Sequence, residues 1–196
     1  MKQDVLQELL AMKQRDSDAR FHLQKSGRLY GDYASDMQRV HRENAEKLAR
    51  IISIHGWPGV TSVGDEGCRA AWLIAQHSIC TPDLQRKFLA VLTEAVGKGD
   101  APLQQLAFLT DRIRFNENKP LVYATVLDWN KKGELGCDVE DRANLDARRK
   151  AVGLAPFRED LERHLEEIRS EGGGPPPNFD EYQRRRDAWA RSVGWL

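Results

Sequence analysis

The chain has 196 residues, of which 40% are apolar and 31% are charged, a composition typical of a globular protein with a highly charged surface. Lys and Arg together number 30, as do Asp and Glu, so the formal net charge of zero gives no field that favours nucleic acid or a membrane surface. No apolar run approaches the roughly 20 residues that span a bilayer, and we do not expect a signal peptide from Met1 to Asp4, which have no basic region followed by an apolar block.

The first two predicted elements are helices. Apolar residues recur with helical spacing over residues 4–25 and again over 35–55. Gly56 is suited to end the second helix, and Pro58 prevents its continuation. The inward face of this helix is predicted to carry Met37, His41, Asn44, Leu48, Ile51 and His55.

Three further helices are predicted in the next part of the chain. Gly64-Asp65 opens the third, and its residues 66–79 form the most apolar segment of the chain, which favours a central position. The fourth begins at Thr81-Pro82, in the preferred order of cap and then proline, and ends near Gly97. The fifth begins at Ala101-Pro102.

A small β-hairpin is predicted after the fifth helix. Residues 121–127 are rich in strand-forming side chains, and Asn130 to Gly133 form a turn signal. Residues 134–139 could return as the second strand. Helices are then expected to resume over about 140–152 and 156–170.

A glycine- and proline-rich segment at residues 172–178 is the clearest linker in the chain. It separates a predicted helical domain, residues 1–171, from a C-terminal amphipathic helix at 179–196. The predicted fold class is therefore all-α: a bundle of about six to seven helices with one small β-hairpin.

Polar side chains at positions where a helical core is usually apolar are the candidates for a functional site, because such groups are costly to bury without partners. His77 is the candidate acid–base catalyst, since an imidazole titrates near pH 6.5, and Asp111 is its candidate orienting group. The alternatives are that His77 caps its own helix or is a satisfied core histidine, and that Asp111 forms an interhelical salt bridge.

Other polar residues are candidate substrate contacts. Arg112 could bind an anion in bidentate fashion, and Arg148-Arg149 could bind a carboxylate or phosphate, although two arginines in a charged helix are more often solvated. Asn44 could contact a ligand or fix helix register through a buried hydrogen bond. The full candidate set for substrate binding is Arg112, Asn44, Gln76, His55, Tyr123 and Arg148. Asp16 and Arg20 are four residues apart, a spacing typical of a surface ion pair.

Neither a metal nor a cofactor is expected from the motifs. His55, His77, Asp111 and a His77-x-x-Cys80 spacing do not make a recognised ligand set, and the chain has no HExxH, CxxC, GxGxxG, phosphate-binding loop or GxSxG. Its three cysteines are odd in number and widely spaced, so we expect no disulfide framework and a cytoplasmic location.

Several of these motifs, taken in order, resemble a bacterial domain-of-unknown-function family over about residues 5–160. That family has the pattern GWP…QH…DR…YGTQ…RR…GL. The matching segments are Gly56-Trp57-Pro58, Gln76-His77, Asp111-Arg112, Tyr123-Ala124-Thr125, Arg148-Arg149 and Gly153-Leu154. The resemblance implies a mostly helical fold and a residue set, but no reaction. Ala124 and Val126 stand where the pattern has Gly and Gln, so a pocket lined by this segment should be drier or take a different ligand.

Two functions remain open from the sequence. The first is a small cytosolic, metal-independent enzyme with a histidine-centred acid–base site for a small-molecule substrate that is polar or anionic. The second is a binding or regulatory module whose C-terminal helix binds a protein partner or forms a homodimer. That surface would consist of Phe179, Tyr182, Trp189 and Trp195, with Arg184, Arg185 and Arg186 at its rim.

Overall fold

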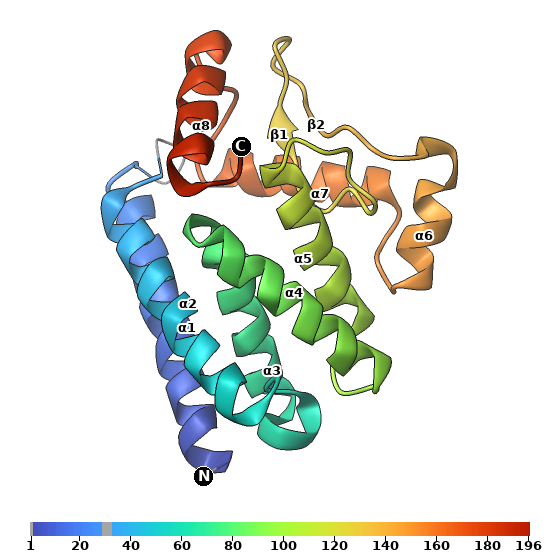
Figure 1. The fold of residues 1–196 in the computed structure, drawn as a ribbon. Helices are drawn as coiled ribbons and strands as arrows, with labels where there is room; N and C mark the ends of the chain where they lie inside the picture. Colours follow the sequence, from blue (N-terminus) through green and yellow to red (C-terminus); the bar gives the residue numbers. More distant parts are fainter. Residues whose placement is uncertain (1, 29–32) are drawn as a thin grey trace. The chain divides into compact units, whose positions relative to one another are not determined.

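The computed structural model describes residues 2–28 and 33–196. Within these ranges the protein is mostly helical, with eight α-helices and one two-stranded antiparallel sheet, which confirms the predicted fold class (Figure 1). The chain divides into two compact units, Met1–Leu109 and Thr110–Leu196, and each is described by itself.

Unit 1 is built from the first helices of the chain. Helix α1 packs against both α2 and α3, and α2 also packs against α4 (Figure 1). Helix α5 begins in this unit and crosses the boundary at Leu109. The elements are α1 Lys2–Lys25, α2 Ser35–His55, α3 Val60–His77, the 3-10 helix η1 Ser78–Cys80, α4 Pro82–Gly97 and α5 Leu103–Asn116.

Helix α2 shows how the apolar pattern positions side chains. The predicted inward face is buried from Met37 to Ile51, including the polar residues His41 and Asn44. His55 departs from the prediction and is exposed, because the helix ends there and Gly56 turns the chain at a φ of 74°. A substrate contact at His55 would therefore lie at an exposed helix end.

Helix α3 is central to unit 1, as its apolar sequence predicts. It begins at Val60, earlier than expected, but Gly64 interrupts it with a non-helical φ of 73°. The small residue Gly67 lets α1 approach closely, since a Cβ at this position would lie 2.9 Å from Leu6 Cδ1. The fully buried apolar side chains of unit 1 include Leu9, Met12, Leu48, Ile74, Phe88, Leu92 and Leu109.

Unit 2 contains the hairpin and the last helices. Strand β1, Asp128–Trp129, pairs antiparallel with β2, Leu135–Gly136, and the turn between them lies where Asn130 and Gly133 predict it. The expected first strand at 121–127 is wrong, because the backbone groups of this segment bond mainly to side chains of α5 and α6. The helical elements are η2 Arg142–Asn144, α6 Leu145–Ala151, α7 Phe157–Ser170 and α8 Phe179–Val193.

Helix α8 is held by side chains of the same unit. Tyr182 Oη donates to Asp128 Oδ1 at 2.6 Å, and Arg186 Nη1 donates to Asp128 Oδ2 at 2.9 Å. The Arg186 guanidinium also lies over the Phe115 ring, 5.1 Å from its centroid. Tyr182 and Arg186, two residues of the surface predicted for a partner, are therefore engaged inside unit 2.

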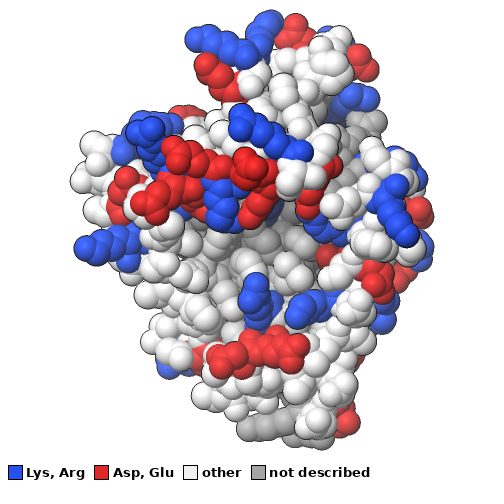
Figure 2. Space-filling model, turned by 180° about the vertical axis from the view of Figure 1, so that it is seen from behind, with Lys and Arg blue, Asp and Glu red and all other residues white. Residues whose placement is uncertain are grey.

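The surface carries both signs of charge. On the face drawn in Figure 2, acidic and basic side chains lie close to one another and do not gather into a field of one sign. Among the helices of residues 2–28 and 33–196, none has the length and apolar character needed to cross a bilayer.

Candidate functional site

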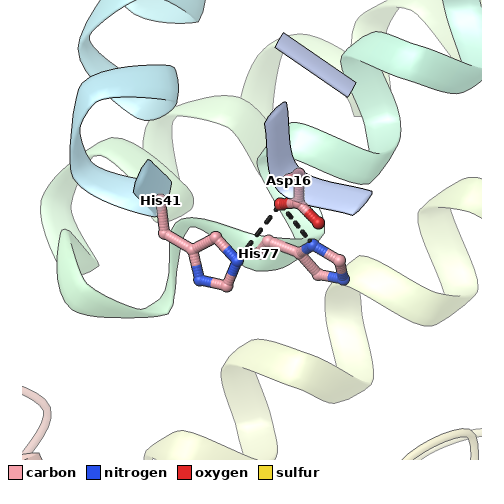
Figure 3. Close-up of side chains that lie close together, drawn as sticks. All are labelled: Asp16, His41 and His77. Carbon is pink, nitrogen blue, oxygen red and sulfur yellow. Dashed lines mark hydrogen bonds and ion pairs between the residues drawn. The ribbon is translucent and has the colours of Figure 1, made fainter. Parts of the chain in front are cut away.

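Three polar side chains from three helices of unit 1 converge on one point, and we call them the Asp16–His41–His77 cluster (Figure 3). Asp16 lies on α1, His41 on α2 and His77 at the end of α3. His77 Nδ1 lies 2.8 Å from Asp16 Oδ2, and His41 Nε2 lies 3.1 Å from the same oxygen. Both imidazoles therefore share one carboxylate oxygen.

The cluster continues into a fourth side chain. Tyr33 Oη and His41 Nδ1 are 2.5 Å apart, so both ring nitrogens of His41 have partners. With the tyrosine hydroxyl as donor to Nδ1, Nε2 carries the proton, and its 3.1 Å approach to Asp16 Oδ2 is an ion-pair contact whose geometry is not that of a hydrogen bond. These contacts link the four side chains in the order Tyr33–His41–Asp16–His77.

Asp16 is ionised in this setting. Burial acts to raise the pKa of its carboxyl group, but the close contacts with His41 and His77 outweigh it and hold the pKa well below the usual 3.8. Burial is also the main cause that raises the pKa of the Tyr33 hydroxyl above 10.0. The cluster thus holds a buried anion beside a tyrosine that stays protonated.

His77 is the accessible member of the cluster. Its side chain is 31% exposed, against 8% for His41 and 4% for Asp16. Its Nδ1 faces Asp16, and no hydrogen bond occupies Nε2 within the described residues. A proton could therefore be exchanged at Nε2 while the buried carboxylate orients the ring.

The same cluster could hold a metal ion. One ligand atom from each of its residues lies within 4.8 Å of the others, and two imidazoles with one carboxylate form a known donor set for divalent transition metals. Tyr33 on the far nitrogen of His41 would be the outer partner that orients such a ligand.

Asn44 and Gln76 lie buried in unit 1. Asn44 Nδ2 donates to Met12 O at 3.1 Å, and Arg15 Nη2 donates to Asn44 Oδ1 at 3.3 Å, so this side chain links α1 to α2. The backbone carbonyl of Gln76 accepts a hydrogen bond from Gln85 Nε2, while its own Oε1 has no partner within the described residues.

Asp111 binds the segment that follows α5. Its carboxylate accepts hydrogen bonds from the backbone N–H groups of Val122, Tyr123 and Thr125 and from Thr125 Oγ1, at 2.8 to 3.2 Å. The carboxylate that contacts His77 is that of Asp16. The observed role of Asp111 is therefore to hold a loop of its own unit.

Arg148 and Arg149 bind the carbonyl side of the same loop. Arg148 Nε donates to Val122 O at 3.0 Å, and Arg149 Nη1 donates to Tyr123 O at 2.6 Å. Arg149 is fully buried and also pairs with Asp160, 2.7 Å away. Together with Asp111, these arginines form what we call the loop clamp, and the observed contacts of Tyr123 are made through its backbone.

Three members of the Tyr33–His41–Asp16–His77 chain were not among the predicted site residues. Asp16 was expected in a surface ion pair, but it is only 3% exposed. It follows Leu9 and Met12 on the buried stripe of α1, and His41 follows Met37 on that of α2. The sequence signal that could have identified both residues is a polar side chain at helical spacing from the buried apolar residues of the same helix.

Comparison with known proteins supports the resemblance of the motifs. A family described as a family of unknown function (DUF6624) matches residues 3–171, from the second residue of α1 to just beyond the end of α7. No curated protein and no solved structure matches the chain.

Proposed function

The chain belongs to DUF6624, a family of unknown function, and we propose that it is an enzyme in which His77 transfers a proton to or from a small-molecule substrate. The observation that carries the proposal is the 2.8 Å contact between His77 Nδ1 and the buried carboxylate of Asp16. The substrate class that suits the site is a polar or anionic small molecule.

The chemistry follows from the tautomer that this contact favours. A proton on Nδ1 is donated to Asp16, so Nε2 presents a lone pair and can act as a general base. When Nε2 takes a proton, the adjacent negative charge of Asp16 stabilises the imidazolium. His41 and Tyr33 act as positioning residues, because His41 contacts the same carboxylate oxygen and Tyr33 holds the ring of His41.

A second candidate function is metal-assisted hydrolysis at the same cluster. The specific observation in its favour is the approach of three ligand atoms to within 4.8 Å of one another. In that case Asp16, His41 and His77 would hold the ion, which would supply an activated water for hydrolysis.

The test is a comparison of variants across a panel of p-nitrophenyl esters, phosphate esters and amides. His77→Gln should abolish the turnover shown by the wild type and keep the circular dichroism spectrum, because His77 is partly exposed. His22→Gln is the matched control, since His22 is an exposed histidine on α1 outside the cluster. Full activity of a folded His77→Gln variant would refute the assigned role.

A chemical probe tests the same assignment without a substrate. Diethyl pyrocarbonate modifies an unprotonated, accessible imidazole nitrogen, and peptide mass mapping locates the product. We expect modification of His77 in the wild type, alongside the exposed His22. A His77 that resists the reagent while His22 reacts would show that Nε2 is closed to solvent.

Chelation separates the two candidates. Activity that survives dialysis against a chelator supports proton transfer at His77. Activity that is lost on chelation and restored by Zn²⁺ supports the metal-assisted function.

A further inference from the structure

Arg112 is a partly buried arginine that forms no ion pair with any residue in the described ranges. It lies on α5 in unit 2, directly after Asp111. Its Nε is buried and has no hydrogen-bond partner, and its guanidinium forms no ion pair within the described residues. A cation in such a place is costly unless an anion joins it.

The adjacent carboxylate does not supply that anion. Asp111 accepts hydrogen bonds from three backbone N–H groups and from a hydroxyl, all of them in the segment 122–125. Adjacent residues on a helix also point about 100° apart, so their side chains do not face each other. Burial lowers the pKa of Arg112, and the charge of Asp111 only opposes this effect.

Three neighbouring arginines of unit 2 that are partly or fully buried do have ion-pair partners. Arg114 pairs with Glu140 at 2.5 Å, Arg148 with Asp141 at 3.3 Å and Arg149 with Asp160 at 2.7 Å. Each of these arginines also donates to at least one backbone carbonyl. Arg112 differs from these three arginines, because no carboxylate or backbone carbonyl of the described residues accepts a hydrogen bond from it.

We infer that Arg112 is the binding group of an oxyanion site, which takes the carboxylate or phosphate group of a small ligand. The guanidinium offers a planar fork of donors that matches two oxygens of either group. Arg112 is only partly buried as a whole residue, so an anion can reach the side chain while its Nε stays dry. The inference rests on Arg112 itself and is independent of the proton transfer proposed for His77.

The experiment measures the melting temperature of the full chain in sodium phosphate, sodium acetate and sodium chloride at equal ionic strength. We expect phosphate or acetate to raise the melting temperature of the wild type in a saturable manner, because a ligand that binds only the folded state stabilises it. Arg112→Gln should lose the saturable part. Arg158→Gln is the matched control and should keep it, since Arg158 is 89% exposed. A saturable rise in phosphate indicates a phosphate site, and a saturable rise in acetate indicates a carboxylate site.

Arg112→Met keeps the inference falsifiable if Arg112→Gln is poorly folded. Removal of an unpartnered buried charge should leave the anion-free protein at least as stable as the wild type. Equal anion effects in the wild type and in Arg112→Met would overturn the site, because general exclusion of salt from the surface would explain them. A wild type with no saturable response to either anion would overturn it as well.

Discussion

Asp111 and Thr125 are joined by two hydrogen bonds, since Asp111 Oδ2 accepts from the backbone nitrogen of Thr125 at 2.9 Å and from its Oγ1 at 3.0 Å. The same carboxylate also accepts from the backbone nitrogens of Val122 and Tyr123. One fully buried side chain thus fixes the start, middle and end of a loop.

Asp111→Ala is expected to lower the free energy of unfolding by about 3–5 kcal/mol. The substitution removes the acceptor of three backbone donors, and each buried donor left unsatisfied costs about 1–3 kcal/mol. Urea denaturation measures the loss. Asp138→Ala is the control: this exposed aspartate should change stability by less than about 0.5 kcal/mol. Similar losses in both variants would contradict the role of Asp111.

The two sides of the loop clamp are expected to be coupled. Asp111 binds N–H groups and Arg149 binds carbonyl groups of the same loop. Loss of either residue should therefore reduce the free energy of folding that the other contributes. The double variant Asp111→Asn with Arg149→Lys should lose at least about 1 kcal/mol less than the sum of the single variants. Strict additivity in chemical denaturation would show that the two sides act independently.

Stability should depend on pH through Asp160. Burial acts to raise the pKa of its carboxyl group, but hydrogen bonds from Arg149 and Arg163 outweigh it and hold the pKa below 3.8. Because the folded-state pKa is the lower one, the stabilisation is complete above the unfolded value and is lost as pH falls through the folded value. The stability difference between the wild type and Asp160→Asn should stay constant above about pH 5 and shrink below about pH 4. A difference that grows on acidification would reverse the sign assigned here.

Ala124 should tolerate glycine far better than valine. Its φ is 54°, in the left-handed region, and its side chain is 1% exposed. Glycine should relieve about 1–2 kcal/mol of backbone strain. It also loses the buried methyl group and gains conformational entropy in the unfolded chain, which together cost a similar amount. Ala124→Gly should therefore stay within about 1 kcal/mol of the wild type in its free energy of unfolding. Ala124→Val should lose more than about 2 kcal/mol, because a β-branched residue fits this region poorly. Equal melting temperatures for the two variants would contradict the assigned conformation.

Much of the fold could be predicted because local chemistry sets helix ends. The apolar stripe and Gly56 place the second helix at 35–55, and α2 spans Ser35–His55. Pro82 begins α4 and Gly97 ends it, also as predicted. The strand expected at 121–127 failed for a non-local reason: Asp111, Arg148 and Arg149 bind the polar backbone groups that a strand would pair.

The candidate site could be predicted only in part. His77 was visible as an imidazole in an apolar helix, but its contact with Asp16 joins residues 61 positions apart in the chain. The spacing of Asp16 to Arg20 favoured a surface pair, and only the packing of α1 against α2 and α3 buries Asp16. The spacing of residues within one helix does not predict which side chains of a helix distant in the sequence they will contact.

The packing of α8 bears on how the protein should be divided for experiments. The family match ends at residue 171, whereas Tyr182 and Arg186 beyond it bind Asp128, the first residue of β1. An expression fragment that ends at the family boundary would remove the hydrogen bonds that Tyr182 and Arg186 donate to Asp128. It would also remove the Arg186 guanidinium that lies over the Phe115 ring. The smallest fragment suited to crystallisation or mutational scanning therefore extends one helix past the edge of the homologous region.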